Sequence, residues 1–262
     1  MLIESYEDAL RQRGNHRRKL KLGNKRQRRV GAELNKCRRY HRCKSEACRV
    51  CLREFRLWWL GEATKIMVQR AHWTRCSIIP KGLRVRYGAL STFDLNSEIK
   101  RLRKRIERSA LHGGIVLGGL DVSLNLEKNR VTHWQWHLYL IVEGENDKAL
   151  QEAIKRAFPA DPKALVPYDF QQIDGSDYLK VATYAYKALF KRRSGYTDSQ
   201  GNHRTKDLPL KNCDLRRLLP FLVQHKVGER LILSGVRRNG LRLVLTTKKV
   251  STDHPAAMNR AA

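Results

Sequence analysis

Two stretches of alternating apolar and polar residues, separated by a short polar turn, constrain the fold of this chain more than any other feature. Residues 115–126 and 132–142 each have strand periodicity, and residues 127–130 between them are turn-like. Two such strands joined by a short turn predict a β-hairpin. Successive side chains of a strand point to opposite faces, so Trp134, Trp136, Leu138, Leu140 and Val142 are expected to pack together in the core.

Helices are expected both before and after this hairpin in the chain. The clearest is 95–106, because Leu95, Ile99, Leu102 and Ile106 recur at helical spacing before Gly113-Gly114. The remaining expected elements are helices at 52–74, 147–158, 177–191 and 214–225, β structure at 83–93, a polar loop at 192–207 and a hairpin at 230–247 around Asn239-Gly240. This irregular order predicts an α+β fold with a central antiparallel sheet and flanking helices. The last hairpin is either a DNA-binding wing carrying Arg237, Arg238 and Arg242 or a closure of the main sheet.

The charge of the chain indicates a polyanionic partner. The 262 residues include 54 Lys and Arg against 25 Asp and Glu, a net charge of +29. Between residues 11 and 56, eighteen basic and three acidic residues give +15, and residues 11–29 are expected to stay mobile until they meet a polyanion such as nucleic acid. A hydrophobic fraction of 41% excludes a purely disordered basic tail. The acidic N-terminus and the lack of an eighteen-residue apolar run predict a cytoplasmic protein with no membrane partner.

Four of the six cysteines, Cys37, Cys43, Cys48 and Cys51, lie within one short segment. A pair spaced as Cys48-x2-Cys51 presents two thiolates to one tetrahedral ion, and two further thiolates close the site, which predicts structural zinc. His41 could replace Cys37 or Cys43 as a ligand, and a set of reduced surface thiols is the alternative. The nearby arginines (Arg38, Arg39, Arg42 and Arg49) would place this segment against a phosphate backbone. Cys76 and Cys213 are expected to be small core residues.

The second candidate site lies on the polar face of the hairpin. His133, Gln135, His137 and Tyr139 share that face of one strand, and Asp121, Ser123 and Asn125 share the face of the other. Pairing of the strands would bring an imidazole, an amide and a carboxylate around a divalent cation. The alternative is a polar sheet face whose histidines have no special role.

The third candidate site is a tyrosine beside lysines. Lys180, Tyr184, Lys187 and Lys191 share one face of the expected helix, while Leu179, Ala182, Tyr186 and Leu189 form its apolar stripe. A phenol flanked by ammonium groups is a plausible nucleophile toward phosphorus. A surface tyrosine on a basic helix is the alternative.

In combination and in this order, these elements resemble the plasmid-type rolling-circle replication initiators of the HUH endonuclease superfamily. The resemblance extends from about Cys37 to Lys191 and includes CRVCLREF, YGALSTFDL, GGLDVSLN, HWQWHLYLIV and YAYK. It implies an RRM-like nuclease core. Together with the patterns above, it divides the chain into a basic arm at 1–34, a Cys-rich zinc knuckle and helix at 35–75, a nicking domain at 76–195, a C-terminal helix and hairpin at 196–247, and a disordered tail at 248–262.

The family motifs carry over residue by residue. The first motif falls on Leu90-Ser91-Thr92-Phe93, and the nucleophile motif Tyr-x-x-Lys falls on Tyr184 and Lys187. The motif His-Pro-His-x-His falls on residues 135–139, of which only His137 is retained. Either the ion is held by His137, Gln135 and Asp121, or metal binding is weakened and catalysis is affected.

The resemblance implies that Tyr184 attacks a single-stranded or hairpin origin of a plasmid or other mobile element. The products would be a 5′-phosphotyrosine link and a free 3′-hydroxyl, with Mg2+ or Mn2+ as the catalytic ion and Zn2+ as the structural one. Host helicase and polymerase would be partners. The alternative function is a non-catalytic, zinc-containing DNA-binding protein, either a degenerate initiator or a repressor.

Overall fold

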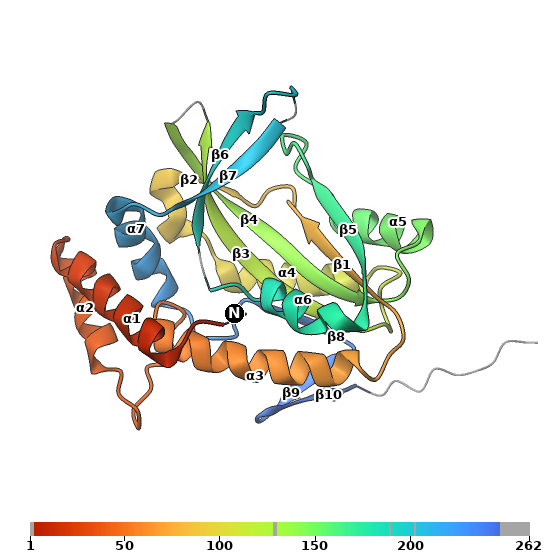
Figure 1. The fold of residues 1–262 in the computed structure, drawn as a ribbon, viewed down its shortest axis with the longest axis horizontal. Coiled ribbons are helices and arrows are strands. Elements are labelled where there is room, and N and C mark those ends of the chain that lie inside the picture. Colours follow the sequence, from red (N-terminus) through yellow and green to blue (C-terminus); the bar gives the residue numbers. More distant parts are fainter. Residues whose placement is uncertain (1–2, 128–129, 189, 202, 247–262) are drawn as a thin grey trace, which may run out of the picture.

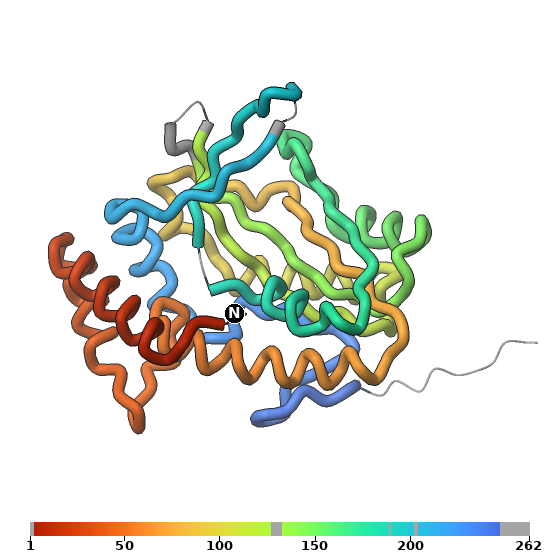
Figure 2. Tube along the Cα trace, viewed as in Figure 1, coloured from red at the N-terminus to blue at the C-terminus, as the bar shows by residue number. Residues whose placement is uncertain are grey.

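The chain folds into a curled mixed β-sheet flanked by helices, an α+β architecture (Figure 1). The structure is a computed structural model that describes residues 3–127, 130–188, 190–201 and 203–246. The α-helices are α1 (Tyr6–Lys21), α2 (Lys25–Lys36), α3 (Arg49–Met67), α4 (Leu95–Glu107), α5 (Lys148–Ala157), α6 (Tyr178–Ala185) and α7 (Asn212–Leu222). The strands are β1 (Trp73–Ile78), β2 (Arg84–Arg86), β3 (Val116–Glu127), β4 (Arg130–Glu143), β5 (Tyr168–Ile173), β6 (Lys191–Thr197), β7 (His203–Pro209), β8 (Leu231–Ser234), β9 (Val236–Asn239) and β10 (Arg242–Leu245). Two 3-10 helices, η1 (Tyr87–Thr92) and η2 (Gly175–Asp177), complete the path traced in Figure 2.

The main sheet has the order β5-β1-β4-β3-β6-β7, with β2 added to β4 and β8 added to β3. All its strand pairs are antiparallel except β3 and β6, which are parallel. The sheet that the sequence predicted to be antiparallel is therefore mixed, because it contains this one parallel pair. Between β3 and β6 the chain passes through β4, α5, β5 and α6, and a long connection of this kind is what a parallel neighbour requires.

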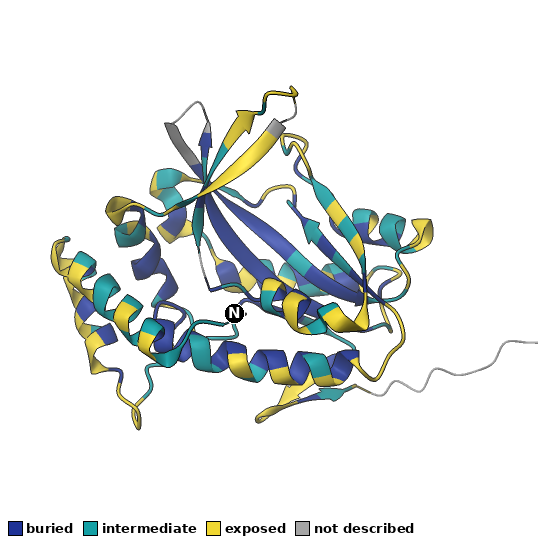
Figure 3. Ribbon diagram, in the orientation of Figure 1, coloured by how far each residue is buried: buried dark blue, intermediate teal, exposed yellow. Residues whose placement is uncertain are grey.

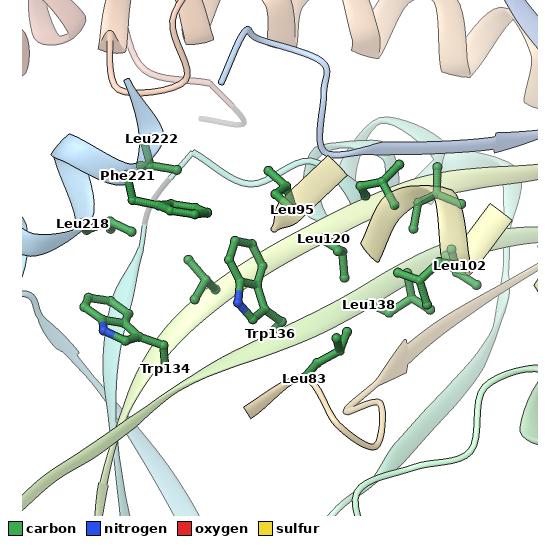
Figure 4. Packing of buried hydrophobic residues seen from close by; sticks show 14 of the residues in the cluster. Leu83, Leu95, Leu102, Leu120, Trp134, Trp136, Leu138, Leu218, Phe221 and Leu222 are labelled. Carbon is green, nitrogen blue, oxygen red and sulfur yellow. The ribbon is translucent and has the colours of Figure 1, made fainter. Parts of the chain in front are cut away.

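The central hairpin of β3 and β4 confirms the strongest sequence prediction. Its tryptophan face is buried, and Figure 4 shows Trp134, Trp136 and Leu138 packed beside Leu102 of α4 and Phe221 of α7. The Trp136 ring lies over Phe93, with centroids 4.7 Å apart. This core fixes the register of the hairpin, because a one-residue slip would turn the tryptophans to the opposite face.

The opposite face of the hairpin is covered only in part by helices. Leu117 and Ile141 belong to a second core with α3 and α6, where Trp59 and Ala182 are fully buried. The Trp59 indole also donates to the Ala182 carbonyl oxygen over 2.8 Å, so α3 holds α6 in place. Along the central strands, the dark blue of buried residues in Figure 3 extends beyond α6. On this face of β3 and β4 the buried side chains there are polar: Asp121, Ser123, Gln135 and His137.

The basic N-terminal segment is helical, contrary to the expected mobile arm. The Ser5 and Asn24 side chains cap α1 and α2, and the few apolar residues of the segment, including Leu20, Val30 and Leu34, are buried in the main core. Because these residues fall on one face of each helix, a small apolar content is sufficient for packing.

Three local predictions are also wrong. Residues 90–93 lie at the end of η1 and the turn after it rather than in a strand, and the β character expected across 83–93 is limited to β2. The polar loop expected at 192–207 is a hairpin of β6 and β7, whose exposed positions lack the apolar alternation that marks a buried strand. The helix expected at 52–74 is α3, which already ends at Met67, and residues 73–74 belong to β1. The predicted tail at 248–262 lies outside the described residues.

Candidate functional site

A row of buried polar side chains crosses the central hairpin on the face opposite the tryptophans. Asp121 pairs in register with His137, and Ser123 pairs with Gln135, as the predicted hairpin requires. All four are at most 6% exposed. The Ser123 hydroxyl lies 2.8 Å from His137 Nε2. The strand alternation thus predicted which side chains converge.

Gly119, on the same face, explains why the end of α6 can approach this row. A Cβ at that position would come within 3.0 Å of the Ala185 carbonyl oxygen and 3.1 Å of the Arg230 carbonyl oxygen. Only glycine leaves room for such close backbone contact.

His137 is held neutral by its surroundings. Burial lowers its pKa well below the usual value, and the nearby charges of Arg193 and Lys187 lower it further. Arg193 Nη1 lies 3.4 Å from His137 Nε2, the same nitrogen that faces Ser123. The neutral imidazole accepts a hydrogen bond there rather than carrying charge.

Asp121 lies in a strongly basic environment. Burial raises its pKa, while Lys187, Arg230 and Arg193 act in the opposite direction. Among the described residues, Asp121 Oδ1 and Gln135 Oε1 have no hydrogen-bond partner. These two buried acceptors require an explanation, because unsatisfied polar atoms are costly.

Tyr184 and Lys187 lie close together, as predicted, but they do not share a helix face. Helix α6 ends at Ala185, so Lys187 follows the helix and Lys191 begins β6. Lys187 Nζ still lies 4.7 Å from the centroid of the Tyr184 ring. The same ammonium donates to the Tyr139 hydroxyl over 2.9 Å. Lys180 turns instead to Asp177, 3.3 Å away.

The apolar stripe predicted for this helix holds for Ala182 and Tyr186, which are buried. Leu179 is 48% exposed, contrary to expectation, and Leu189 lies outside the described residues. Tyr184 is 54% exposed.

One pocket of about 260 Å³ brings the polar row and the tyrosine together. Its lining includes Asp121, Ser123, Tyr184, Lys187 and Arg193. Lys191 of β6 and Asp207 of β7 also line it, so strands β3, β6 and β7 of the sheet all contribute. His137 and Gln135 do not line this pocket, and His137 contacts it through Ser123 and Arg193. Arg193 was not predicted as a site residue, because residues 192–207 were expected to form a loop rather than β6 and β7.

The divalent ion that the resemblance implies fits these residues poorly. His137 Nε2 already faces a hydroxyl and a guanidinium, so an ion bound to that nitrogen would meet the positive charge of Arg193. An ion could use the two unpartnered oxygens of Asp121 and Gln135, but it would stand among the charges of Lys187, Arg193 and Arg230. We conclude that His137, Gln135 and Asp121 are not arranged as a divalent-cation site.

The four clustered cysteines could hold a metal ion. Their sulfur atoms all lie within 4.8 Å of one another, with Cys37 and Cys51 3.6 Å apart, Cys43 and Cys51 3.6 Å apart, and Cys48 and Cys37 3.7 Å apart. Zinc–sulfur bonds of about 2.3 Å in a tetrahedron place the sulfurs about 3.8 Å apart, so this spacing is compatible with structural zinc. Among the described residues it is the only such group of three or more His, Cys, Asp and Glu side chains. His41 is exposed, and the predicted set of four cysteines needs no substitute.

The arginines around the cysteines do not all face outward. Arg49 is buried, pairs with Glu4 over 2.8 Å and donates to the Ala188 carbonyl oxygen. Arg42 pairs with Glu54. Only Arg38 and Arg39 remain exposed for the predicted phosphate contact. Cys76 is buried as predicted, whereas Cys213 is exposed.

A buried ion pair joins the cysteine segment to the candidate site. Glu46, between Cys43 and Cys48, accepts from Arg230 at 3.0 and 3.1 Å, and both side chains are fully buried. Arg230 also donates to the Lys187 carbonyl oxygen over 3.0 Å and to the Leu120 carbonyl oxygen over 2.7 Å. Tyr186 donates its hydroxyl proton to Glu46. These contacts fix the chain immediately before Asp121 and just after Tyr184.

The hairpin predicted around Asn239-Gly240 is present as β9 and β10, while β8 joins the main sheet. The small hairpin packs on α3, because Arg238 lies 4.4 Å from the Trp58 ring centroid and Leu243 N donates to Glu62 over 2.8 Å. It is therefore a pair of strands docked on a helix rather than a closure of the main sheet.

Comparison with known proteins identifies no relative. No protein-family model matches the chain, and no curated protein or solved structure matches it. Within the described ranges, no helix is long and apolar enough to cross a membrane.

Proposed function

We propose that this chain nicks and rejoins single-stranded origin DNA through a covalent tyrosine intermediate, as an initiator of rolling-circle replication. One observation carries the proposal: an exposed tyrosine and a lysine above its ring open into the same pocket as Asp121, Ser123 and Arg193. A phenol beside cationic groups is suited to attack a phosphodiester.

The reaction follows from the chemistry of these groups. The Tyr184 oxygen forms a bond to phosphorus, and the bond from phosphorus to the 3′-oxygen breaks. The phenol proton passes to solvent, and the departing 3′-oxygen takes up a proton. Lys187 offsets negative charge on the phenol or on the phosphate. The phosphotyrosine bond retains the energy needed for rejoining, and the resemblance alone supplies its 5′ polarity and the replication context.

A second pocket supports a path for the strand across the sheet. It has a volume of about 450 Å³ and meets the first at Arg193, with His133 and Gln135 in its lining. Leu165 and Val166, 67% and 64% exposed, form part of its rim and offer apolar surface to bases. A strand bound there would lead to Tyr184.

The same proposal assigns roles to the metal ions and to the host partners. Zinc at the four cysteines is structural, and host helicase and polymerase act on the nicked origin. Mg2+ or Mn2+ remains a prediction of the resemblance, and no step of the mechanism above depends on it.

A covalent-adduct assay tests the function. The protein is incubated with a pool of single-stranded oligonucleotides from its own genetic element and analysed on denaturing gels. We expect an adduct with the wild type and with Tyr196→Phe, a control at an exposed tyrosine, and none with Tyr184→Phe. Failure of the wild type to form an adduct under any ionic condition would contradict the proposal.

The alternative function is a zinc-containing protein that binds DNA without cutting it. It is favoured by the retention of a single histidine at residues 135–139 and by the poor fit of a divalent ion. The same assay separates the two, because only the enzyme forms an adduct.

A further inference from the structure

The position of Arg193 indicates how the candidate site handles the charge of a phosphate. Arg193 lies on β6, paired in parallel register with Asn125 of β3. Its Nη1 is 3.4 Å from His137 Nε2, and the Ser123 hydroxyl is 2.8 Å from that same nitrogen. The guanidinium and the hydroxyl thus face the atom through which an ion on His137 would be bound.

Lys187 brings a second cation into the same pocket. Its ammonium lies 4.0 Å from the centroid of the Tyr139 ring and 4.7 Å from that of Tyr184. Two carboxylates lie near these cations: Asp207, whose contact with Arg193 Nε is long at 3.4 Å and whose side chain is half-exposed, and the buried Asp121. Two cations beside Asp121 leave positive charge in the pocket for a phosphate. A guanidinium presents parallel N–H groups that match two phosphate oxygens, and an ammonium acts as a point charge.

We propose that Arg193 and Lys187 bind the scissile phosphate directly and supply the positive charge for its cleavage, so that nicking needs no divalent ion. This inference rests on the proposed function and concerns the same pocket. Arg193 would hold two non-bridging oxygens, and Lys187 would lie between the phosphate and the Tyr184 phenol. As Tyr184 bonds to phosphorus and the 3′-oxygen leaves, the charge that develops on the non-bridging oxygens is met by N–H donors already in place.

The test measures the rate of adduct formation with EDTA and with added Mg2+ or Mn2+, on the same single-stranded oligonucleotides. Zinc content and circular dichroism are followed in parallel, to show that EDTA leaves the cysteine cluster and the fold intact. We expect the wild type to form the adduct at rates within about twofold in the two conditions, because the charge comes from the chain.

Variants of Arg193 give a second readout. Arg193→Lys retains the charge but loses the two-pronged geometry, and it should slow adduct formation about 100-fold, the usual effect of losing one preorganised donor. Arg204→Lys, on the neighbouring strand β7 and paired with Asp198, is the matched control and should leave the rate unchanged.

The outcomes distinguish this inference from the function on which it rests. An adduct that forms only with Mg2+ or Mn2+ would overturn the inference and leave the proposed function intact. An unchanged rate in Arg193→Lys would also overturn it. No adduct in either condition would overturn the proposed function and this inference with it.

Discussion

Two tyrosines only two positions apart have opposite environments. Tyr186 is 1% exposed, and burial together with Glu46 raises its pKa well above the usual value, so it remains a neutral hydrogen-bond donor. Tyr184 is 54% exposed beside Lys187. Helical periodicity correctly assigned Tyr186 to the core. It did not predict the charged partners of Tyr186, because Glu46 and Arg230 are 184 residues apart and nothing local in the sequence pairs them.

Removing the charge of Glu46 should destabilise the whole protein. In Glu46→Gln, Arg230 stays fully buried without its carboxylate, and breaking a buried pair of this kind costs about 3–5 kcal/mol. Urea unfolding measures the free energy of unfolding. Asp8→Asn, which breaks the exposed pair with Arg11, is the control and should cost less than about 1 kcal/mol. A similarly small loss in Glu46→Gln would contradict the role given to this ion pair.

Among the helices and strands, hydrophobic periodicity predicted the ones that pack one face against a core. The central hairpin, α4, α5, α7 and the turn at Asn239-Gly240 were all expected. The missed elements carry weaker signals. Strand β1 is short and follows a helix rich in apolar residues, while β6 and β7 are largely polar because both lie toward an exposed edge of the sheet. The same error hid Arg193, so the candidate site was only partly predictable from the sequence.

Helix α1 should contribute to the loss of stability in acid. Burial lowers the pKa of His16 from 6.5 to about 4, so between these values the unfolded chain binds more protons than the folded one. The contribution of His16 to the free energy of unfolding is therefore fully present above the unfolded pKa. It is lost as the pH drops toward the folded pKa, by about 3 kcal/mol for the full shift. His16→Gln should lose less stability than the wild type between neutral pH and the folded pKa in urea unfolding. Equal losses in the two proteins would contradict this.

The cysteine segment should carry one zinc ion per chain. The sulfur spacing suits a tetrahedral site, and the segment connects α2 to α3. Elemental analysis of purified protein should find about one zinc, lost in Cys48→Ser or Cys51→Ser but retained in Cys213→Ser, a change at an exposed cysteine outside the cluster. Native protein that contains no zinc would rule out the assignment.

At the scale of the molecule, much of the exposed positive charge lies on α1 and α2, while the candidate site lies on the central sheet (Figure 1). The net charge of +29 predicted a polyanionic partner but not this separation. A binding surface apart from the reacting pocket would let the helices hold DNA while the sheet positions one strand.

Binding of single-stranded DNA should therefore weaken steeply with salt. Replacing the exposed Lys21, Lys25 and Arg26 by Gln should reduce the slope of log affinity against log salt by about 2, since each phosphate contact on a single strand contributes about 0.7. The same charge removed from α4 and α5, by replacing Lys100, Lys104 and Lys148, should change the slope less. Equal effects of the two sets would contradict the assignment of this surface.

The identity of the residue that bonds to DNA decides whether Tyr184 is the nucleophile. The measurement is peptide mass spectrometry of the nuclease-trimmed protein–DNA adduct. We expect a nucleotide phosphate on the peptide containing Tyr184, with fragment ions that assign it to Tyr184 rather than to Tyr186. A nucleotide on any other residue, or an adduct that persists in Tyr184→Phe, would contradict it.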